Sequence, residues 1–306
     1  MKRKIIALLL LFSMLGFASF GVDAKSWQKP TYIYGGGLNE DQILSISKTF
    51  GIDEGADVLS SPVTGEDLVK YIDGEPTATE DMISSTLVTK KGEGTGVQVE
   101  IKTPSNITLV SKEQYANAAI TAGVSDVEIF IAAPYPVTGE SALSGVYKAF
   151  DLNGEDLKKS GMKLAQEELS VTTEITEEAK DKEDFDEAKL SQAILDMKNE
   201  IIAAIEKEGG ITREEIARIV NEALAKVNLD KVVTQVHIDK LIVYFEQFSK
   251  TTDLDFDKIK EQLSTLGKDL APKIQDLVED AKASGLWDRI VDILAKIFEA
   301  IANIFR

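Results

Sequence analysis

The chain of 306 residues lacks cysteine, which excludes disulfide bonds, thiolate metal sites and the acylated cysteine of a lipoprotein. Histidine occurs once, so a metal site built from several imidazoles is excluded as well. Basic residues are scarce, because 34 Lys and Arg stand against 52 Asp and Glu, and the formal net charge is −18. Proteins hold nucleic-acid phosphates with Lys and Arg, so we expect no nucleic-acid partner. An acidic surface suits solubility and cation binding instead.

Long apolar runs are missing outside the first residues of the chain. There, basic residues 2–4 precede the apolar run Ile5–Phe20, and small residues follow up to Ala24. The run is shorter than the roughly 20 residues that cross a bilayer, and this order of segments is that of a secretory signal peptide. We therefore expect a signal peptide over residues 1–24, cleaved near Ala24, and a secreted or cell-envelope protein. An uncleaved anchor is the alternative.

An internal repeat is the most informative pattern that the chain does contain. Three segments of a first copy, 38–42, 51–52 and 62–66, return in order in a second copy as 110–114, 123–124 and 136–140. In each copy a polar cap, Asn39 or Ser111, predicts a helix that a glycine ends, and Pro-Val-Thr-Gly-Glu leads into a second helix. We expect two βαβα units, at about 31–72 and 105–149, in a duplicated α/β domain over residues 25–150.

The residues between the two copies predict a β-hairpin. Ile83–Lys90 and Val97–Lys102 flank a glycine-rich turn, and the second of these strands alternates apolar and polar residues. We expect one face of the hairpin to lie in water. The glycines of Gly92–Gly96 resemble a phosphate loop only superficially, because a strand and not a helix follows them.

From about residue 154 the composition changes, since proline nearly vanishes and apolar residues recur at helical spacing. Thr212 and Glu215 form a capping-box pattern, and a helix is expected to be kinked or broken before Pro272. One apolar stripe consists of Leu190, Ile194, Met197, Ile201 and Ile205. The sequence therefore predicts an all-α helical domain over residues 151–306 and an α+β fold class for the whole chain.

The last segment, residues 286–306, predicts an amphipathic helix with a wide apolar face. That face contains Leu286, Trp287, Ile290, Leu294, Ile297, Phe298, Ile301 and Phe305. Such a face can pack on the chain's own helices, on a second copy or on a lipid surface. Its charges balance, whereas helices that bind anionic membranes are usually basic.

The paired Pro-Val-Thr-Gly-Glu turns supply the candidate site residues Thr64, Glu66, Thr138 and Glu140. If pseudo-symmetry relates the copies, these residues approach one another at one rim. Two carboxylates and two hydroxyls could hold a cation such as calcium, or a sugar. The alternative is structural, because a threonine caps a helix, a glycine eases the turn and a glutamate complements the helix dipole. No other cofactor and no catalytic residue is predicted.

Other motifs have a structural explanation. His237 lies at helical spacing between apolar residues, which predicts a packed histidine. Gly35–Gly37 connects a strand to a helix whose free amides could hold an anion, although a flexible connection explains it better, since Glu40 and Asp41 already complement that helix end. Asp253–Asp257 begins like a calcium loop, but Lys258 stands where that loop needs glycine, so helix capping by Asp255 explains it better.

A family resemblance rests on the second copy. The stretch Tyr115–Val124, with Ala133-Pro134, Val137–Glu140 and Tyr147–Ala149 after it, resembles the YpuA-like family. That family gathers secreted proteins of unknown function from Gram-positive bacteria. The resemblance implies export to the cell envelope or medium, and it supplies no activity, cofactor or catalytic residue.

These patterns favour an exported, non-catalytic binding protein whose partner is a protein or another component of the cell envelope. Two alternatives stay open. A pair of carboxylates is sufficient for glycoside hydrolysis, so a hydrolase acting on cell-wall glycans is one. The other is a membrane-surface protein that uses residues 286–306, and self-association through that segment is a further possibility.

Overall fold

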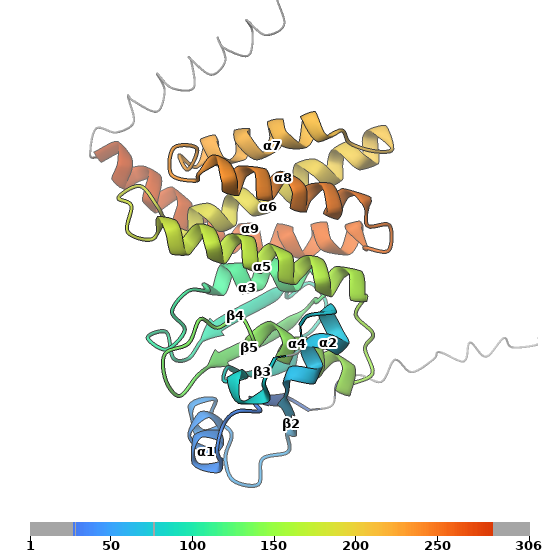
Figure 1. Cartoon of the computed structure of the whole chain (residues 1–306), viewed down its shortest axis with the longest axis vertical. Coiled ribbons are helices and arrows are strands. Elements are labelled where there is room, and N and C mark those ends of the chain that lie inside the picture. The colour runs from blue at the N-terminus through green and yellow to red at the C-terminus, as the bar shows by residue number, and fades with distance from the viewer. Residues whose placement is uncertain (1–26, 28, 76, 284–306) are drawn as a thin grey trace, which may run out of the picture.

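The computed structural model describes residue 27, residues 29–75 and residues 77–283. Within them a five-stranded sheet, helices packed on it and a layer of long helices follow one another along the molecule (Figure 1). The predicted α+β class is confirmed. The expected signal peptide, residues 1–24, and the expected terminal helix, residues 286–306, lie outside the described residues.

The sheet consists of β1 (Thr31–Gly35), β2 (Leu59–Val63), β3 (Ser85–Lys90), β4 (Val97–Ile101) and β5 (Val127–Ala132). Their order across the sheet is β2-β1-β3-β5-β4. β1 pairs with β2 in parallel and β4 pairs with β5 in parallel, while β3 is antiparallel to both of its neighbours. In the described part of the chain, every strand except β3 therefore runs in one direction.

The first copy has the predicted order β1-α1-β2-α2. The second copy, expected at about 105–149, contains α3, β5 and α4, and the strand that gives it the same order, β4, lies before it, in the segment that the sequence assigned to the hairpin. The helices are α1 (Glu40–Thr49), α2 (Gly65–Ile72), α3 (Lys112–Thr121) and α4 (Ala142–Leu152), and a short 3-10 helix η1 (Thr79–Asp81) precedes β3. The predicted caps are confirmed, because Asn39 with Gln42 and Ser111 with Gln114 form capping boxes. Gly51 and Gly123 follow α1 and α3 with positive φ.

The predicted hairpin is wrong. Both strands form near the expected positions, but β5 lies between β3 and β4 and pairs with each of them. β3 becomes the central strand, and its first four residues are all buried. β4 becomes an edge strand with Gln98 and Glu100 in water, so the expected wet face is present. Periodicity reports which face of a strand is wet and does not report which strand lies next to it.

The first helices of the two copies lie on opposite faces of the sheet. Phe50, which follows α1, packs edge-on against Tyr32, and the strand register places Tyr32, Leu87 and Phe130 on one face. Val97 and Val99 point to the other face, where they meet Ala116 of α3. The crossovers β1-α1-β2 and β4-α3-β5 each join two parallel strands that run in the same direction, and each moves by one strand position toward the same side of the sheet. Because their helices lie on opposite faces of the sheet, the two crossovers have opposite handedness. One of the two is therefore a left-handed crossover, which is rare.

The helical layer consists of α5 (Lys159–Ala179), α6 (Glu187–Glu208), α7 (Arg213–Lys226), α8 (Gln235–Lys250) and α9 (Phe256–Ala283). The capping box of Thr212 and Glu215 is confirmed. Helix α9 continues through Pro272, so it is not broken there, and the alternative, a kink before that residue, stays a prediction. No helix in the described ranges is long and apolar enough to cross a membrane.

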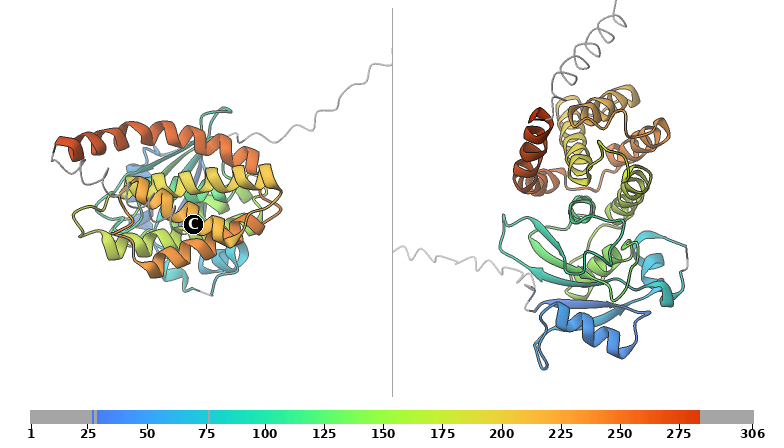
Figure 2. Two further views of the ribbon diagram at one scale, coloured as in Figure 1. Left: turned by 90° about the horizontal axis from the view of Figure 1, so that it is seen from above. Right: turned by 90° about the vertical axis from the view of Figure 1, so that its left-hand side faces the viewer.

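Helix α3 joins the sheet to the helical layer. It lies between the sheet and helices α5, α6 and α9 (Figure 2), and all of its residues from Gln114 to Thr121 are buried. Small side chains such as Ala116, Ala118 and Ala119 let neighbours approach it closely. The hydrophobic core is continuous across this helix, and the division at residue 150 stays a prediction.

Candidate functional site

The first Pro-Val-Thr-Gly-Glu turn has a structural role. Pro62 and Val63 end β2, and Thr64 is the N-cap of α2. The amide of Thr64 donates to Asp67 Oδ2 at 2.7 Å, which closes a capping box. Glu66 is exposed in the first turn of the helix, where it complements the dipole.

The second Pro-Val-Thr-Gly-Glu turn, residues 136–140, has the same sequence as the first and a different geometry. Val137 forms an isolated bridge with Ile107, and α4 begins only at Ala142. Thr138 is exposed, and its hydroxyl donates to Glu140 at 3.3 Å instead of capping a helix. Gly139 has φ of 102°, and its carbonyl accepts a bond of 2.6 Å from the buried hydroxyl of Tyr115. Burial, with the charge of Glu140 nearby, raises the pKa of Tyr115 above its ordinary value.

The two turns lie at the same edge of the sheet, because β2 and β5 run in the same direction. β1 and β3 separate them, which amounts to three strand spacings, or about 14 Å. Thr138 and Glu140 line a pocket at this edge, whereas Thr64 and Glu66 do not line it. The four candidate residues are therefore not brought together in that pocket. Within the described ranges no cluster of three or more Asp, Glu, His or Cys could hold a metal ion.

We call this cavity the edge pocket. It has a volume of about 370 Å³ and lies between α2, the segment before β3, the second turn and Gln166 of α5. Its polar lining comes from Glu75, Thr77, Asp81, Ser84, Thr138, Glu140, Ser141 and Gln166, and its apolar lining from Leu68, Ile72, Met82, Ile83 and Val137. In α/β sheets the carboxyl ends of parallel strands are the usual place for ligands.

Unpartnered polar atoms line the edge pocket. Ser84 is only 1% exposed, and its Oγ has no hydrogen-bond partner among the described residues. The Oε1 atom of Gln166 is also buried and has no hydrogen-bond partner among the described residues. Six other described residues that do not line the pocket, among them Thr86 and Ser144, also have a buried polar atom without a partner. An unsatisfied buried polar group costs about 1–3 kcal/mol, and such groups are rare in folded proteins. The pocket lining therefore includes two residues with a buried polar atom that lacks a partner.

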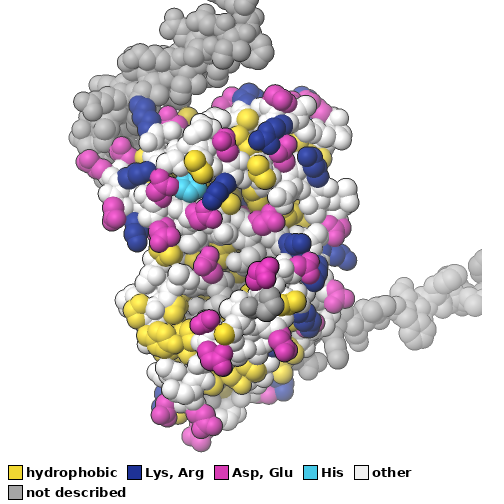
Figure 3. Space-filling view, in the orientation of Figure 1, with side chains coloured by type: hydrophobic (Ala, Val, Ile, Leu, Met, Phe, Trp, Pro, Cys, Tyr) yellow, Lys and Arg dark blue, Asp and Glu magenta, His cyan; other side chains and the backbone are white. Residues whose placement is uncertain are grey.

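The charge of the edge pocket has one sign. Among the described residues that line it there is no Lys, Arg or His, whereas Glu75, Asp81 and Glu140 contribute carboxylates. Glu75 and Asp81 are exposed, and Glu140 is half-buried. On the face shown in Figure 3, Lys and Arg gather mainly over the helical layer, and hydrophobic side chains form a patch over the sheet layer. An anionic ligand would meet repulsion in this pocket.

Glycines let the walls of the edge pocket approach the strands. A Cβ on Gly65 would lie 1.6 Å from the carbonyl oxygen of Thr77, and one on Gly37 would lie 2.3 Å from that of Glu80. The amides of Gly36 and Gly37 donate to the carbonyls of Val63 and Met82 at 2.8 and 3.0 Å. Gly35–Gly37 is therefore a close-packed connection whose amides are already occupied, and an anion site there is not supported.

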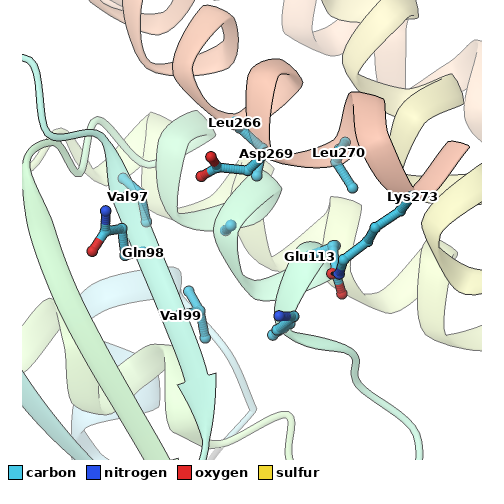
Figure 4. A pocket seen from close by; sticks show the side chains of 10 residues that line it. Val97, Gln98, Val99, Glu113, Leu266, Asp269, Leu270 and Lys273 are labelled. Carbon is cyan, nitrogen blue, oxygen red and sulfur yellow. Dashed lines mark hydrogen bonds and ion pairs between the residues drawn. The ribbon is translucent and has the colours of Figure 1, made fainter. Parts of the chain in front are cut away.

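A smaller cavity of about 140 Å³ lies between β4, α3 and α9 (Figure 4). Glu113 and Lys273 form an ion pair at one end of it, and Val97 and Leu266 belong to its apolar lining. Ligand sites are usually larger, at roughly 300–1,000 Å³. Val97, at the start of the edge strand, is almost fully buried beside α9. We interpret this region as the cover of the β4 edge.

A buried ion pair lies where α3, α5, α6 and α8 meet. The Nζ of Lys198 donates to Glu168 at 2.7 Å and to the carbonyl of Asn117 at 2.9 Å. Glu168 also accepts bonds from Thr121 at 2.6 Å and from Tyr244 at 2.7 Å. Burial lowers the pKa of Lys198, although Glu168 opposes this, and burial raises the pKa of Tyr244. Lys198 and Glu168 are 0% and 2% exposed, and the bonds above pair both charges within the protein, so we assign this network a structural role.

The remaining sequence motifs have structural roles. His237 is 7% exposed, and its Nδ1 lies 3.1 Å from Thr234 Oγ1 and 3.2 Å from Glu178. Asp255 accepts from the amide of Lys258 at 3.0 Å, which confirms helix capping. Gly94 and Gly96 have positive φ in the connection between β3 and β4, and β4 follows them.

Sequence reasoning missed Ser84, Gln166 and the Lys198–Glu168 pair. Lys198 is four residues from Ile194 and three from Ile201, so it lies on the predicted apolar stripe, and a charge on that face was a readable signal. Ser84 had no such signal, because a serine in front of a strand is common and only its neighbours in space leave it unpartnered.

The fold and the site define the class of the molecule: an α+β protein with a mixed sheet under a helical layer and a polar pocket at the carboxyl edge of its parallel strands. The chain belongs to the family described as "Protein of unknown function (DUF1002)", which matches residues 34–266 and so every residue of the edge pocket. It is similar to "Uncharacterized protein YpuA" of Bacillus subtilis (strain 168), with 26% identity over 245 residues, 79% of this chain and 77% of that protein. The resemblance that the sequence predicted is confirmed. No solved structure matches the chain significantly.

Proposed function

We propose that the protein is an exported, non-catalytic binding protein that holds its ligand in the edge pocket. The observation that carries this proposal is the pair of unpartnered atoms, Ser84 Oγ and Gln166 Oε1, in a cavity of ligand size. Both atoms are enclosed as the side chains stand, so a ligand with hydrogen-bonding groups would satisfy them, and recover the free energy that their burial costs, once the side chains turn toward it.

The acids of the pocket favour binding over hydrolysis. A glycosidase needs one carboxyl group that stays protonated near neutral pH, and burial in an apolar site is what achieves this. Glu75 and Asp81 lie in water, and the half-buried Glu140 accepts a bond from the hydroxyl of Thr138. This arrangement suits carboxylates that accept hydrogen bonds from a ligand.

Export is supported by the order of basic, apolar and small residues in the first 24 residues. It is tested by N-terminal sequencing of the protein recovered from the culture medium and from the cell envelope. A mature N-terminus next to Ala24 is expected. An intact N-terminus in the cytoplasmic fraction would overturn this part of the proposal.

Binding and hydrolysis are separated by one experiment with isolated peptidoglycan. The mature chain is sedimented with the insoluble glycan, and the supernatant is assayed for reducing ends. Co-sedimentation without new reducing ends is expected. Release of reducing ends that Glu140→Gln abolishes would establish the hydrolase instead, and absence of co-sedimentation would remove a wall-bound role.

Contact with a membrane through residues 286–306 remains a second proposal, supported by the apolar face of that segment in the sequence. It is tested by co-sedimentation of the mature chain with neutral and anionic vesicles, beside a form that ends at Ser284. Loss of vesicle binding on truncation would support it. Equal behaviour of the two forms would remove it.

A further inference from the structure

The ligand class can be narrowed, and this step rests on the proposed function. We propose that the edge pocket takes a non-anionic glycan, which is a sugar with free hydroxyls and without carboxylate, phosphate or sulfate groups. Three properties of the lining support this class: its hydrogen-bonding groups, its charge and its apolar floor.

The hydrogen-bonding groups match sugar hydroxyls. A hydroxyl both donates and accepts, and so do the lining hydroxyls of Thr77, Ser84 and Ser141. Ser84 is the most telling of them, since it is 99% removed from solvent on folding and its oxygen has no partner. Gln166 offers a buried acceptor, and the carboxylate of Glu140 offers two more acceptor oxygens. A ligand rich in hydroxyls can satisfy all of these together.

The charge of the pocket excludes the acidic sugars. Three carboxylates line it and no cation does among its described residues, so a uronate or a phosphorylated sugar would face repulsion without a counter-charge. Neutral sugars and amino sugars meet no such penalty. An isolated divalent cation is a poorer fit, because the described residues contain no cluster of three acidic or imidazole ligands.

The apolar floor matches the C–H face of a pyranose ring. Leu68, Ile72 and Met82 line the same cavity as the polar groups, as in other sites that combine apolar walls with a few polar contacts. The volume of about 370 Å³ lies within the usual range for small-molecule sites.

The test is calorimetric titration of the mature chain with four probes: chitotetraose and maltotetraose as neutral sugars, chitosan tetramer as an amine-bearing sugar and tetragalacturonate as an anionic sugar. Measurable binding is expected for at least one of the first three. Tetragalacturonate should bind at least tenfold more weakly. Equal affinity for tetragalacturonate would overturn the proposed class.

Two variants locate the binding. Ser84→Ala and Gln166→Leu should each weaken the binding of the best probe by about tenfold, since each removes one buried hydrogen bond. Ser191→Ala is the matched control, because Ser191 is also 1% exposed with an unpartnered hydroxyl but does not line the pocket. Unchanged affinity in both pocket variants would place the sugar elsewhere and overturn the assignment.

The failure of this inference differs from the failure of the proposed function. If the chain sediments with peptidoglycan but none of the neutral or amine-bearing probes binds, the ligand class is wrong and the binding role stands. If neither peptidoglycan nor any soluble probe binds, the binding role itself is wrong. Thermal unfolding of each variant shows whether a lost affinity reflects a lost fold.

Discussion

The two copies of the repeat share an order of elements and differ in their surroundings. α1 lies on one face of the sheet, and Ile46 is its one buried residue. α3 lies on the opposite face and is buried between the sheet and the helical layer. The capping boxes at the starts of both helices are alike, and the Pro-Val-Thr-Gly-Glu turns that follow are not. The capping boxes are therefore retained in both copies, while tertiary packing determines the different structural role of each copy.

The edge pocket arises from this difference. In the first copy the Pro-Val-Thr-Gly-Glu turn caps helix α2. In the second copy the same turn caps no helix, because α4 starts later. The pocket lies between the end of one copy and the turn of the other, so neither copy alone would form it. A duplicated unit can thus create a site at the junction of its copies without any change in its motif.

The largest expected effect comes from removing the ion pair that holds the second copy to the helical layer. Lys198→Ala would leave Glu168 buried and uncompensated, so we expect the free energy of unfolding to fall by about 3–5 kcal/mol. Lys70→Ala is the control, since it breaks an exposed pair with Asp151 and should cost less than about 1 kcal/mol. Urea denaturation measures both. Equal costs would show that the buried pair does not anchor α3.

Substitution of the glycine in each of the two turns should destabilise the fold for a different reason. Gly65→Ala brings a Cβ against a backbone carbonyl, whereas Gly139→Ala meets the hydroxyl of Tyr115 at 2.4 Å in a backbone of positive φ. Each substitution should cost about 1–3 kcal/mol. Tyr115→Phe should partly rescue Gly139→Ala in a double-mutant cycle and should not rescue Gly65→Ala. Rescue of both, or of neither, would contradict the distinct roles of the turns.

Alkaline pH should destabilise both copies, since burial raises the pKa of Tyr32 and Tyr71 in the first copy and of Tyr115 in the second. Burial raises the pKa of Tyr115 above its ordinary value of about 10, and the aligned position in the first copy is Ile43, which does not titrate. The folded state keeps a proton that the unfolded chain loses, so the stabilisation is complete below pH 10 and falls as the pH rises above it. Tyr115→Phe should flatten this slope by up to about 1.4 kcal/mol per pH unit.

Denaturation curves between pH 9 and pH 11 measure this slope. Tyr135→Phe serves as the control, because Tyr135 is 41% exposed and its substitution should leave the slope unchanged. An identical slope in the wild-type chain and in Tyr115→Phe would contradict the prediction.

The smallest effect is expected at the helix caps. Asn39→Ala and Ser111→Ala each remove one capping bond, worth about 1 kcal/mol. The loss at Ser111 should be the larger, because its partner Gln114 is buried and also donates to Thr176 at 3.2 Å. Thermal unfolding of the two variants compares them. A larger loss at Asn39 would show that burial does not strengthen this motif.

Much of the fold could be predicted from the sequence. The strands near residues 31, 85, 97 and 127 and the capping boxes follow from patterns within a few residues, such as alternation in β4 or Thr212 with Glu215. The pairing of β3 with β5 could not be predicted, because hydrogen bonds between strands depend on residues far apart in the chain. The break that Pro272 suggested does not occur, since α9 continues through that residue.

For the site, the sequence pointed to a motif that does line a pocket, but it predicted the wrong partners for that motif. Thr138 and Glu140 do line a pocket, but their expected partners Thr64 and Glu66 lie outside its lining. The prediction of a symmetric rim assumed that the same sequence in both turns gives them the same position relative to the pocket. The structure separates the turns by two strands and supplies Ser84 and Gln166 instead.

The sequence by itself determined the α+β class, the repeated order of elements, the acidic balance and the family, because composition, periodicity and local caps act over short distances along the chain. The tertiary structure alone decided the insertion of β5, the opposite faces of α1 and α3, the burial of Lys198 and the composition of the edge pocket. These features depend on long-range packing, in which a residue's partners, and not its identity, determine whether it is satisfied or left free to bind.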